Sequence, residues 1–228
     1  MSLKQLPLDL GYRPALNRAD LYVTAGNEEA VFWIDRWPDW SGHALGLYGP
    51  EGCGKTHLVH AFASRSNAYV VGEKELASKD PVAIANSHNV VALDRISGPI
   101  HEQNLFHLFN AVREAQGFLL IASREPPARW SIKLPDLESR LKGMATVQIL
   151  SPDDATLSAV LAKLFRDRQL LITPDVIEYA VNRMPRTFAA TRALVELIDK
   201  EALAQNRRVT VPLVRDVLAM PEFQAASG

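Results

Sequence analysis

Eight residues near position 50 carry the clearest chemical signal in the chain. They read Gly49-Pro50-Glu51-Gly52-Cys53-Gly54-Lys55-Thr56 and match the phosphate-loop pattern G-x-x-x-x-G-K-[ST] at every required position. Glycines let backbone N–H groups approach phosphate oxygens closely, and a helix that follows places its positive end at the same point. We expect Lys55 to reach the outer phosphates and Thr56 to offer its hydroxyl to Mg²⁺, with His57 next to them in the site.

The residues that flank this loop have the right character for such a site. Residues 43–48 are short and apolar enough for a buried strand, and residues 56–64 carry apolar side chains at helical spacing. A strand, a glycine loop and a helix in that order distinguish a nucleotide site from an accidental glycine-rich turn. The sequence therefore predicts that the chain binds ADP or ATP together with Mg²⁺.

A second signal, an acidic residue at the end of an apolar run, lies 39 residues after Lys55. Residues 89–94 form an apolar run that ends in Asp94, which predicts a strand whose terminal carboxylate holds Mg²⁺ through water. The alternative is that Asp94 caps the next segment. Arg95 follows directly, where many such ATPases carry an acid that orients the attacking water. A cation does not do that work, so slow or absent hydrolysis is expected.

Three further polar residues could belong to a nucleotide site. Ser123 ends an apolar run, 118–123, where a residue could sense a γ-phosphate. Arg140 is either a surface arginine on a helical turn or a cation offered to a neighbouring subunit's nucleotide. Arg186 either turns toward the phosphates across a domain boundary or faces solvent. Spacing alone does not choose between these alternatives.

Composition excludes several classes of protein. The chain has 228 residues, 47% of them hydrophobic, with 25 basic and 26 acidic residues, and the two signs are equal in number from residue 151 onward. This balance argues against a dedicated DNA-binding surface. A single cysteine, Cys53, excludes a disulfide framework and favours a reducing cytosol. No apolar run approaches a membrane span, and the six histidines show no metal-ligand spacing.

The order of apolar runs predicts an α/β domain followed by a helical one. A helix at 28–37 carries aromatic residues that either cover an adenine base or fill the core. At Ser151-Pro152 the composition changes, and the serine, the proline and two acids predict a helix start. Strands are expected at 43–48, 68–71, 89–94, 118–123 and 145–150. Helices are expected at 56–64, 102–116, 153–168, 174–184, 187–205 and 212–219.

The first residues of the chain follow a different pattern. Gln5-Leu6-Pro7-Leu8-Asp9-Leu10 places leucines at alternate positions, as in an extended peptide that fills pockets on one side. The pockets belong either to a partner or to the chain's own core. We therefore divide the chain into an extended peptide at 1–11, a nucleotide-binding α/β domain at 12–150 and a helical domain at 151–228.

Taken together, these motifs resemble a known family. The phosphate loop, the strand ending in Asp94, the segment Leu134-Pro135-Asp136-Leu137-Glu138-Ser139-Arg140-Leu141 and the helical C-terminal part are similar to the DnaA-like AAA+ family, and within it to the Hda-type regulators that inactivate the replication initiator DnaA. The resemblance covers nearly the whole chain. It implies a P-loop AAA+ core with a five-stranded parallel sheet flanked by helices, followed by a small all-helical lid.

The resemblance also implies roles for individual residues. Asp94 would be the acid on the Mg²⁺ side, and Ser123 would lie in the sensor-one region. Arg140 would be an arginine finger that acts in trans, and Arg186 would take the sensor-two position, although Met184-Pro185 before it make the local match imperfect. At the N-terminus, the residues that would bind the sliding clamp, the β subunit of DNA polymerase III, are Gln5, Leu6, Leu8 and Leu10.

The function implied is the regulatory inactivation of DnaA. A nucleotide-bound protein on the clamp would stimulate hydrolysis of DnaA-bound ATP and so limit re-initiation of replication, in the cytoplasm at the replisome. Its partners would be DnaA, the clamp and, in a homodimer or homo-oligomer, a second copy. Strong direct binding to DNA or a membrane is not expected. Two alternatives stay open: an autonomous AAA+ ATPase such as a helicase loader, and a non-catalytic adaptor between clamp and initiator.

Overall fold

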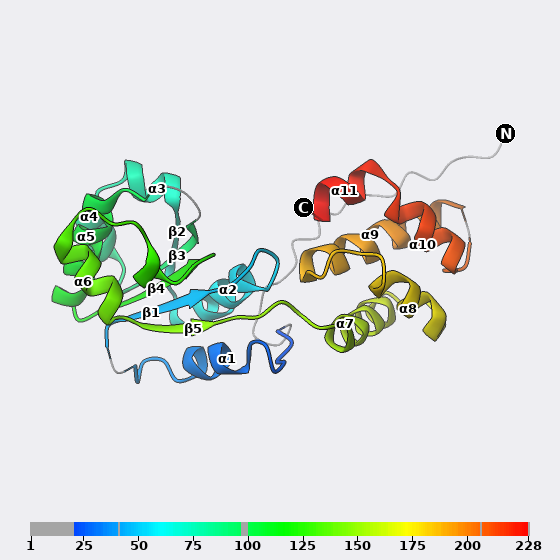
Figure 1. Ribbon diagram of the computed structural model, residues 1–228, viewed down its shortest axis with the longest axis horizontal. Coiled ribbons are helices and arrows are strands. Elements are labelled where there is room, and N and C mark those ends of the chain that lie inside the picture. Colours follow the sequence, from blue (N-terminus) through cyan, green and yellow to red (C-terminus); the bar gives the residue numbers. More distant parts are fainter. Residues whose placement is uncertain (1–20, 41, 97–99, 206, 228) are drawn as a thin grey trace.

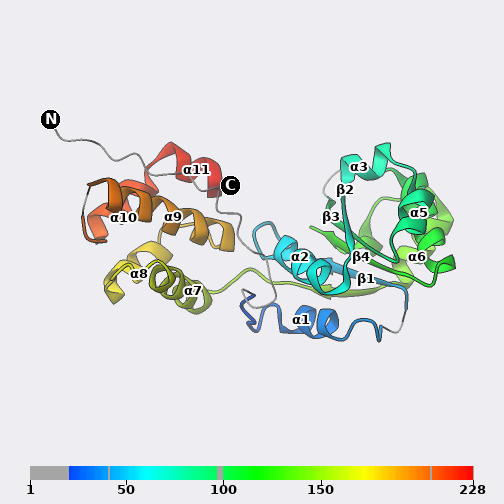
Figure 2. The same ribbon diagram turned by 180° about the vertical axis from the view of Figure 1, so that it is seen from behind.

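The computed structural model of the chain describes residues 21–40, 42–96, 100–205 and 207–227. The predicted extended peptide, with Gln5, Leu6, Leu8 and Leu10, lies outside these residues. The described part forms an α/β unit and an all-helical unit, which are joined by the segment between strand β5 (Ala145–Gln148) and helix α7 (Asp154–Asp167). Figure 1 shows the two units side by side, and Figure 2 shows the same arrangement from behind.

A parallel five-stranded sheet is the centre of the α/β unit, as the sequence predicts. The strand order is β2-β3-β4-β1-β5 and every pairing is parallel. Because parallel strands run the same way, their carboxyl ends meet at one edge, where Tyr48 of β1 lies beside Ser123 of β4. The strands other than β5 are β1 (Ala44–Tyr48), β2 (Tyr69–Gly72), β3 (Val90–Ile96) and β4 (Phe118–Ser123).

Helices cover both faces of this sheet. On one face α1 (Glu28–Asp35) and α2 (Lys55–Ser66) pack against residues such as Ala92 and Leu120. On the other, residues such as Leu93 and Ile121 meet the remaining helices. Burial on both faces explains why the strands read as continuous apolar runs. The helices on the second face are α3 (Glu73–Ser78), α4 (Pro81–Ser87), α5 (Glu102–Glu114) and α6 (Pro135–Gly143), with a 3₁₀ turn at Pro127–Arg129.

The helical unit begins two residues later than its predicted cap. Asp153, and not Ser151, precedes the first helix and accepts a hydrogen bond from the backbone N–H of Thr156 at 2.8 Å. That hydrogen bond lowers the pKa of the Asp153 carboxyl below its ordinary value. A carboxylate accepts hydrogen bonds from the free N–H groups of a first helical turn and also interacts favourably with the positive end of the helix dipole. Pro152 therefore lies outside the helix rather than at its first position.

The longest helix of the second unit, α9, runs through the middle of its core. Buried residues such as Leu194 and Ile198 contact the other helices, and Phe223 of α11 packs against the same cluster. The predicted helices are present, and α11 was not predicted. Besides α7, the helices are α8 (Pro174–Val181), α9 (Phe188–Gln205), α10 (Val211–Leu218) and α11 (Pro221–Ser227).

None of the helices in the described ranges combines the length and the apolarity that a bilayer span requires.

Two leucines on α9 give a direct test of this core. Leu194 is fully buried, whereas Leu203 on the same helix is 74% exposed. We expect Leu194→Ala to lower the free energy of unfolding by about 2–5 kcal/mol, because it leaves a cavity in a packed core. Leu203→Ala, the same chemical change, should stay within about 0.5 kcal/mol. Urea denaturation measures both, and equal effects would contradict the observed packing.

Candidate functional site

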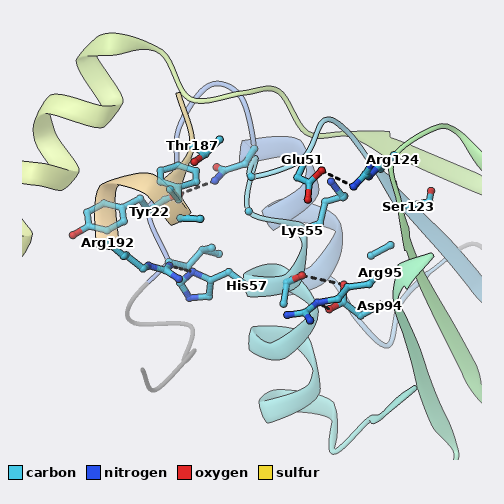
Figure 3. Close-up of a pocket in the computed structure, with 18 of the residues that line it drawn as sticks. Tyr22, Glu51, Lys55, His57, Asp94, Arg95, Ser123, Arg124, Thr187 and Arg192 are labelled. Carbon is cyan, nitrogen blue, oxygen red and sulfur yellow. Dashed lines mark hydrogen bonds and ion pairs between the residues drawn. The ribbon is translucent and has the colours of Figure 1, made fainter. Parts of the chain in front are cut away.

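A cavity of about 580 Å³ lies at the carboxyl edge of the sheet, and residues from both units line it. The α/β unit contributes the phosphate loop, the end of β3, the end of β4 and the segment that precedes α1. The helical unit contributes the start of α9, including Thr187, Phe188 and Arg192. Figure 3 shows these side chains converging from both sides. We call the boundary at this cavity the core–lid seam.

The phosphate loop adopts a backbone that depends on its glycines. A Cβ atom at Gly49 would lie 2.1 Å from the backbone oxygen of Ile149, so no side chain fits there. Gly52 has a φ of 73°, in the left-handed region. Helix α2 begins at Lys55, so its free N–H groups face the cavity. Of the predicted loop residues, those that line the cavity are Glu51, Gly52, Gly54, Lys55, Thr56 and His57.

Contacts within the loop fix its shape and the position of the Lys55 ammonium. Cys53 is buried, and burial raises the pKa of its thiol above the ordinary value, so it is a packing residue. The ammonium of Lys55 donates hydrogen bonds to the backbone oxygens of Gly49 and Pro50, each at 2.7 Å. Glu51 forms an ion pair with Arg124 beside that ammonium. The loop therefore holds a cation at the mouth of the cavity.

Thr56 and Asp94 lie together, as the sequence predicts for the Mg²⁺ side of the site. The Thr56 hydroxyl donates to Oδ1 of Asp94 at 3.2 Å, and Asp94 is buried. Mg²⁺ prefers oxygen ligands and commonly takes one or two from the protein with the rest from phosphate and water. No group of three or more His, Cys, Asp or Glu side chains gathers within the described ranges. The pair thus fits a magnesium ion carried by a nucleotide, not a separate protein cage.

Ser123 and Arg95 lie on either side of this pair. Ser123 is buried at the end of β4, and its hydroxyl donates to the backbone oxygen of Glu125 at 2.7 Å. It lines the cavity, but its sensing role stays a prediction. The guanidinium of Arg95 lies beside Asp94, with Nε 3.7 Å from Oδ2. A cation and not an acid therefore follows the buried carboxylate.

The helical unit contributes a different arginine to the cavity from the one that the sequence suggested. Arg186 pairs with Asp154 of α7 at 2.9 Å, is largely exposed, and does not line the cavity. Arg192, almost two turns further along, lies in the cavity with its Nη2 2.9 Å from Nδ1 of His57. Positions 188, 189 and 192 share one face of α9, and this helical spacing is the signal that could have identified Arg192.

The aromatic residues of the predicted 28–37 helix do not line the cavity: its two tryptophans belong to the core, and Phe32 is exposed. Trp33 and Trp37 pack with the cluster behind β1, and Trp37 makes an edge contact with Phe62 at 5.9 Å between ring centroids. The residues that line the cavity from this part of the chain are Leu21, Tyr22 and Asn27. The ammonium of Lys163, on α7, lies 4.9 Å from the Tyr22 ring centroid, so this segment also contacts the helical unit.

Arg140 lies away from this site. It is half-buried on α6, with its guanidinium 5.2 Å from the centroid of the Phe106 ring on α5. It lines a second cavity, of about 460 Å³, whose other residues include Ala44 and Ala145 at the amino ends of β1 and β5. The phosphate loop follows the carboxyl end of β1. Arg140 and the first cavity therefore lie at opposite edges of one sheet.

The sheet order, the phosphate loop and the helical second unit define a P-loop protein of the AAA+ class. Residues 153–218 match the family model described as "Hda, lid domain". The helical unit is therefore similar to the lid domain of Hda. The chain is also 29% identical over 187 residues to an uncharacterized protein of Haemophilus influenzae, a match that covers 75% of this chain and 80% of that one.

Several solved structures share the fold of this chain. Domain III of the Thermotoga maritima replication initiation protein DnaA superposes with a TM-score of 0.76 at 17% identity, covering 91% of this chain and 99% of that chain. AMPPCP-bound DnaA from Aquifex aeolicus has a TM-score of 0.71 at 20% identity, covering 85% and 68%. A point mutant of Thermotoga maritima RuvB has a TM-score of 0.66 at 17% identity, covering 85% and 67%.

Gly52 tests the contact between the two units. A Cβ added there would lie 2.4 Å from Cβ of Thr187, and its φ of 73° disfavours any L side chain. We expect Gly52→Ala to lower the free energy of unfolding by about 1–3 kcal/mol, because overpacking and backbone strain act together. Gly42→Ala is the matched control, since a Cβ at Gly42 meets nothing within 4 Å. Thermal or urea denaturation that ranks the two variants equally would contradict the close approach at the core–lid seam.

Proposed function

We propose that this protein is a regulator of DnaA that holds ADP or ATP in its own cavity and offers Arg140 to the nucleotide of DnaA. The observation that carries the proposal is the position of Arg140, at the sheet edge opposite to its own phosphate loop. Strand β1, which separates the two edges, has five residues and is on the order of 15 Å long. This position supports a role for Arg140 on the nucleotide of another molecule rather than on its own.

The support for nucleotide binding comes from the groups that face the cavity. Backbone N–H groups of the phosphate loop, the helix dipole of α2 and the ammonium of Lys55 all favour an anion. Thr56 and Asp94 are the residues that would hold Mg²⁺, which when bound neutralises charge on the phosphates. The DnaA of Aquifex aeolicus, which has the same fold, binds AMPPCP. ADP is the nucleotide that we favour.

The bound nucleotide has a structural task in this proposal. Residues of both units line the cavity, so a ligand in it contacts the α/β unit and the lid together. Such a ligand stabilises their arrangement because it binds only where both surfaces are in place. Turnover is not required for this task. Arg95 follows Asp94 where a base would orient water, which agrees with weak or absent hydrolysis by this chain.

The chemistry of Arg140 in trans is electrostatic. A guanidinium placed on a transferring phosphoryl group stabilises the charge that develops in the transition state, and an arginine supplied by a second protein is worth about 10³–10⁵ in rate. Stacking on Phe106 limits the conformations of the Arg140 side chain before any partner binds. Lysine lacks the planar fork and would not replace it. Stimulated DnaA would then retain ADP and stop initiating.

Residues 5–10 bring the regulator to its place of action in this proposal. The peptide would bind in extended form to an apolar pocket of the sliding clamp, with Gln5, Leu6, Leu8 and Leu10 as anchors. A clamp loaded on DNA would concentrate the protein in the cytoplasm at the replisome, where DnaA–ATP is to be inactivated. Association through a tethered site raises the local concentration without any new contact to the initiator.

Arg140→Ala tests the central step. In an ATPase assay with DnaA and DNA-loaded clamp, we expect the variant to lose stimulation by a factor of about 10³ or more while clamp binding is kept. Lys142→Ala is the matched control, because Lys142 lies on the same helix, paired at the surface with Glu138. Full stimulation by Arg140→Ala would remove this residue from the mechanism. If the wild type binds both partners but does not stimulate hydrolysis, a plain adaptor is favoured. If the protein alone hydrolyses ATP rapidly, an autonomous ATPase is favoured.

The N-terminal peptide has a separate test. We expect Gln5→Ala combined with Leu8→Ala to abolish retention on immobilised clamp, because the two anchors supply a polar and an apolar contact in the same pocket. Lys4→Ala combined with Asp9→Ala changes neighbouring side chains that are not anchors and should leave retention intact. If the first variant is retained as well as the wild type, the alternative is favoured in which residues 5–10 pack on their own domain.

A further inference from the structure

Arg95 has a backbone conformation that its position in the sequence does not require. In the part of the chain that the structure describes, four non-glycine residues have positive φ: Asn67, Arg95, Gln116 and Gln169. Three of them follow the C-terminus of a helix, where a left-handed residue is ordinary. Arg95, with a φ of 58°, lies within strand β3. A residue with a long side chain thus has a backbone conformation that glycine and asparagine adopt more readily.

The cause is an irregularity in the pairing of β3 with β4. Leu93 pairs with Ile121 and Ile96 pairs with Ser123, so three steps along β3 correspond to two steps along β4. One extra residue is therefore accommodated at Asp94 and Arg95. Such a bulge re-aims side chains and is common beside functional sites. Here it brings the Arg95 guanidinium beside Asp94, where Figure 3 shows the two side chains together at the edge of the cavity.

The bulge leaves Asp94 with a contact on each oxygen. Oδ1 accepts the hydrogen bond from Thr56 at 3.2 Å, and Oδ2 lies 3.7 Å from Nε of Arg95. The Asp94 side chain is 9% exposed, whereas that of Arg95 is 81% exposed. The carboxylate is thus fixed in place, and the guanidinium lies at the solvent side, free to extend over a ligand that enters the cavity.

The other cations around the cavity have contacts of their own, and the Lys55 ammonium is hydrogen-bonded to backbone oxygens. Arg124 pairs with Glu51, and Arg192 contacts His57. The diphosphate of a nucleotide is strongly anionic, and a divalent cation beside Thr56 and Asp94 is the usual means of neutralising it. A guanidinium at the same carboxylate supplies positive charge there and at the same time lowers the attraction of Asp94 for a cation.

We propose that Arg95 replaces much of the electrostatic contribution of Mg²⁺, so that the protein binds ADP with nearly the same affinity in the presence and absence of the metal. This inference rests on the proposed nucleotide site and is independent of Arg140 and of the N-terminal peptide. It also gives the strained conformation a purpose, since strain of this kind persists where the surrounding structure enforces it and clusters at ligand sites.

Titration with a fluorescent ADP derivative, in magnesium chloride and in EDTA, tests the inference by affinity alone. For the wild type we expect the dissociation constant to change by less than about threefold between the two buffers. Arg95→Asn removes the charge but tolerates the left-handed backbone, so the fold is kept. We expect this variant to bind about tenfold or more weakly in EDTA than in magnesium chloride.

Arg215→Asn is the matched control for this experiment. Arg215 is also exposed beside a neighbouring aspartate, with Nε 3.6 Å from Asp216, but it lies on α10 away from the cavity. It should behave as the wild type does. A wild type that loses about tenfold or more of its affinity in EDTA, or an Arg95→Asn variant as insensitive to the metal as the wild type, would overturn the inference. A folded wild type that binds in neither buffer would overturn the nucleotide site itself, and this inference with it.

Discussion

The parallel alignment of β1, β3 and β4 is the constraint on which the site depends. Because these strands run in one direction, the loop after β1, Asp94 on β3 and Ser123 on β4 reach the same edge of the sheet. The loop then begins α2, which adds the positive end of a helix dipole at that edge. The opposite edge receives the amino ends of the strands and, beside them, Arg140 on α6. One topological fact thus separates the phosphate loop from Arg140.

The lid completes this site instead of merely adjoining it. Phe188 donates its backbone N–H to the backbone oxygen of Gly52 at 3.3 Å, and Thr187 lies against the same glycine. Arg192 contacts His57 at the start of α2. These contacts join the first turn of α9 directly to the phosphate loop. The α/β unit and the lid therefore make their closest contacts at the phosphate loop.

The sequence was sufficient for the fold and for one side of the site. The phosphate loop, Thr56, Asp94 and Ser123 come from runs whose apolar pattern fixes where each strand ends, so their meeting could be predicted. The other side depends on how α9 is rotated against the loop, which is decided by long-range packing. Arg186 was expected at the cavity, but the observed rotation of α9 brings Arg192 there instead. The aromatic helix failed to supply a base-covering residue for the same reason, because Trp33 and Trp37 satisfy the core first.

Local sequence patterns also failed to predict two details, the cap of α7 and the bulge in β3. The serine, proline and acids around residue 152 offer two possible caps, and Asp153 prevails because its carboxylate reaches Thr156. The bulge at Arg95 has no signature in the apolar pattern, because β3 is covered on both faces and the extra residue interrupts no alternation of buried and exposed side chains.

Helix α9 has a mechanical consequence for the lid. It starts at the hydrogen bond to Gly52 and continues for 18 residues through the centre of the lid core, a length of about 27 Å. Because that core is close-packed, α7, α8, α10 and α11 must move with the helix as one body. A rotation of about 5° at its first turn would displace its far end by about 2 Å. A movement at the phosphate loop would therefore be amplified at the outer surface of the lid.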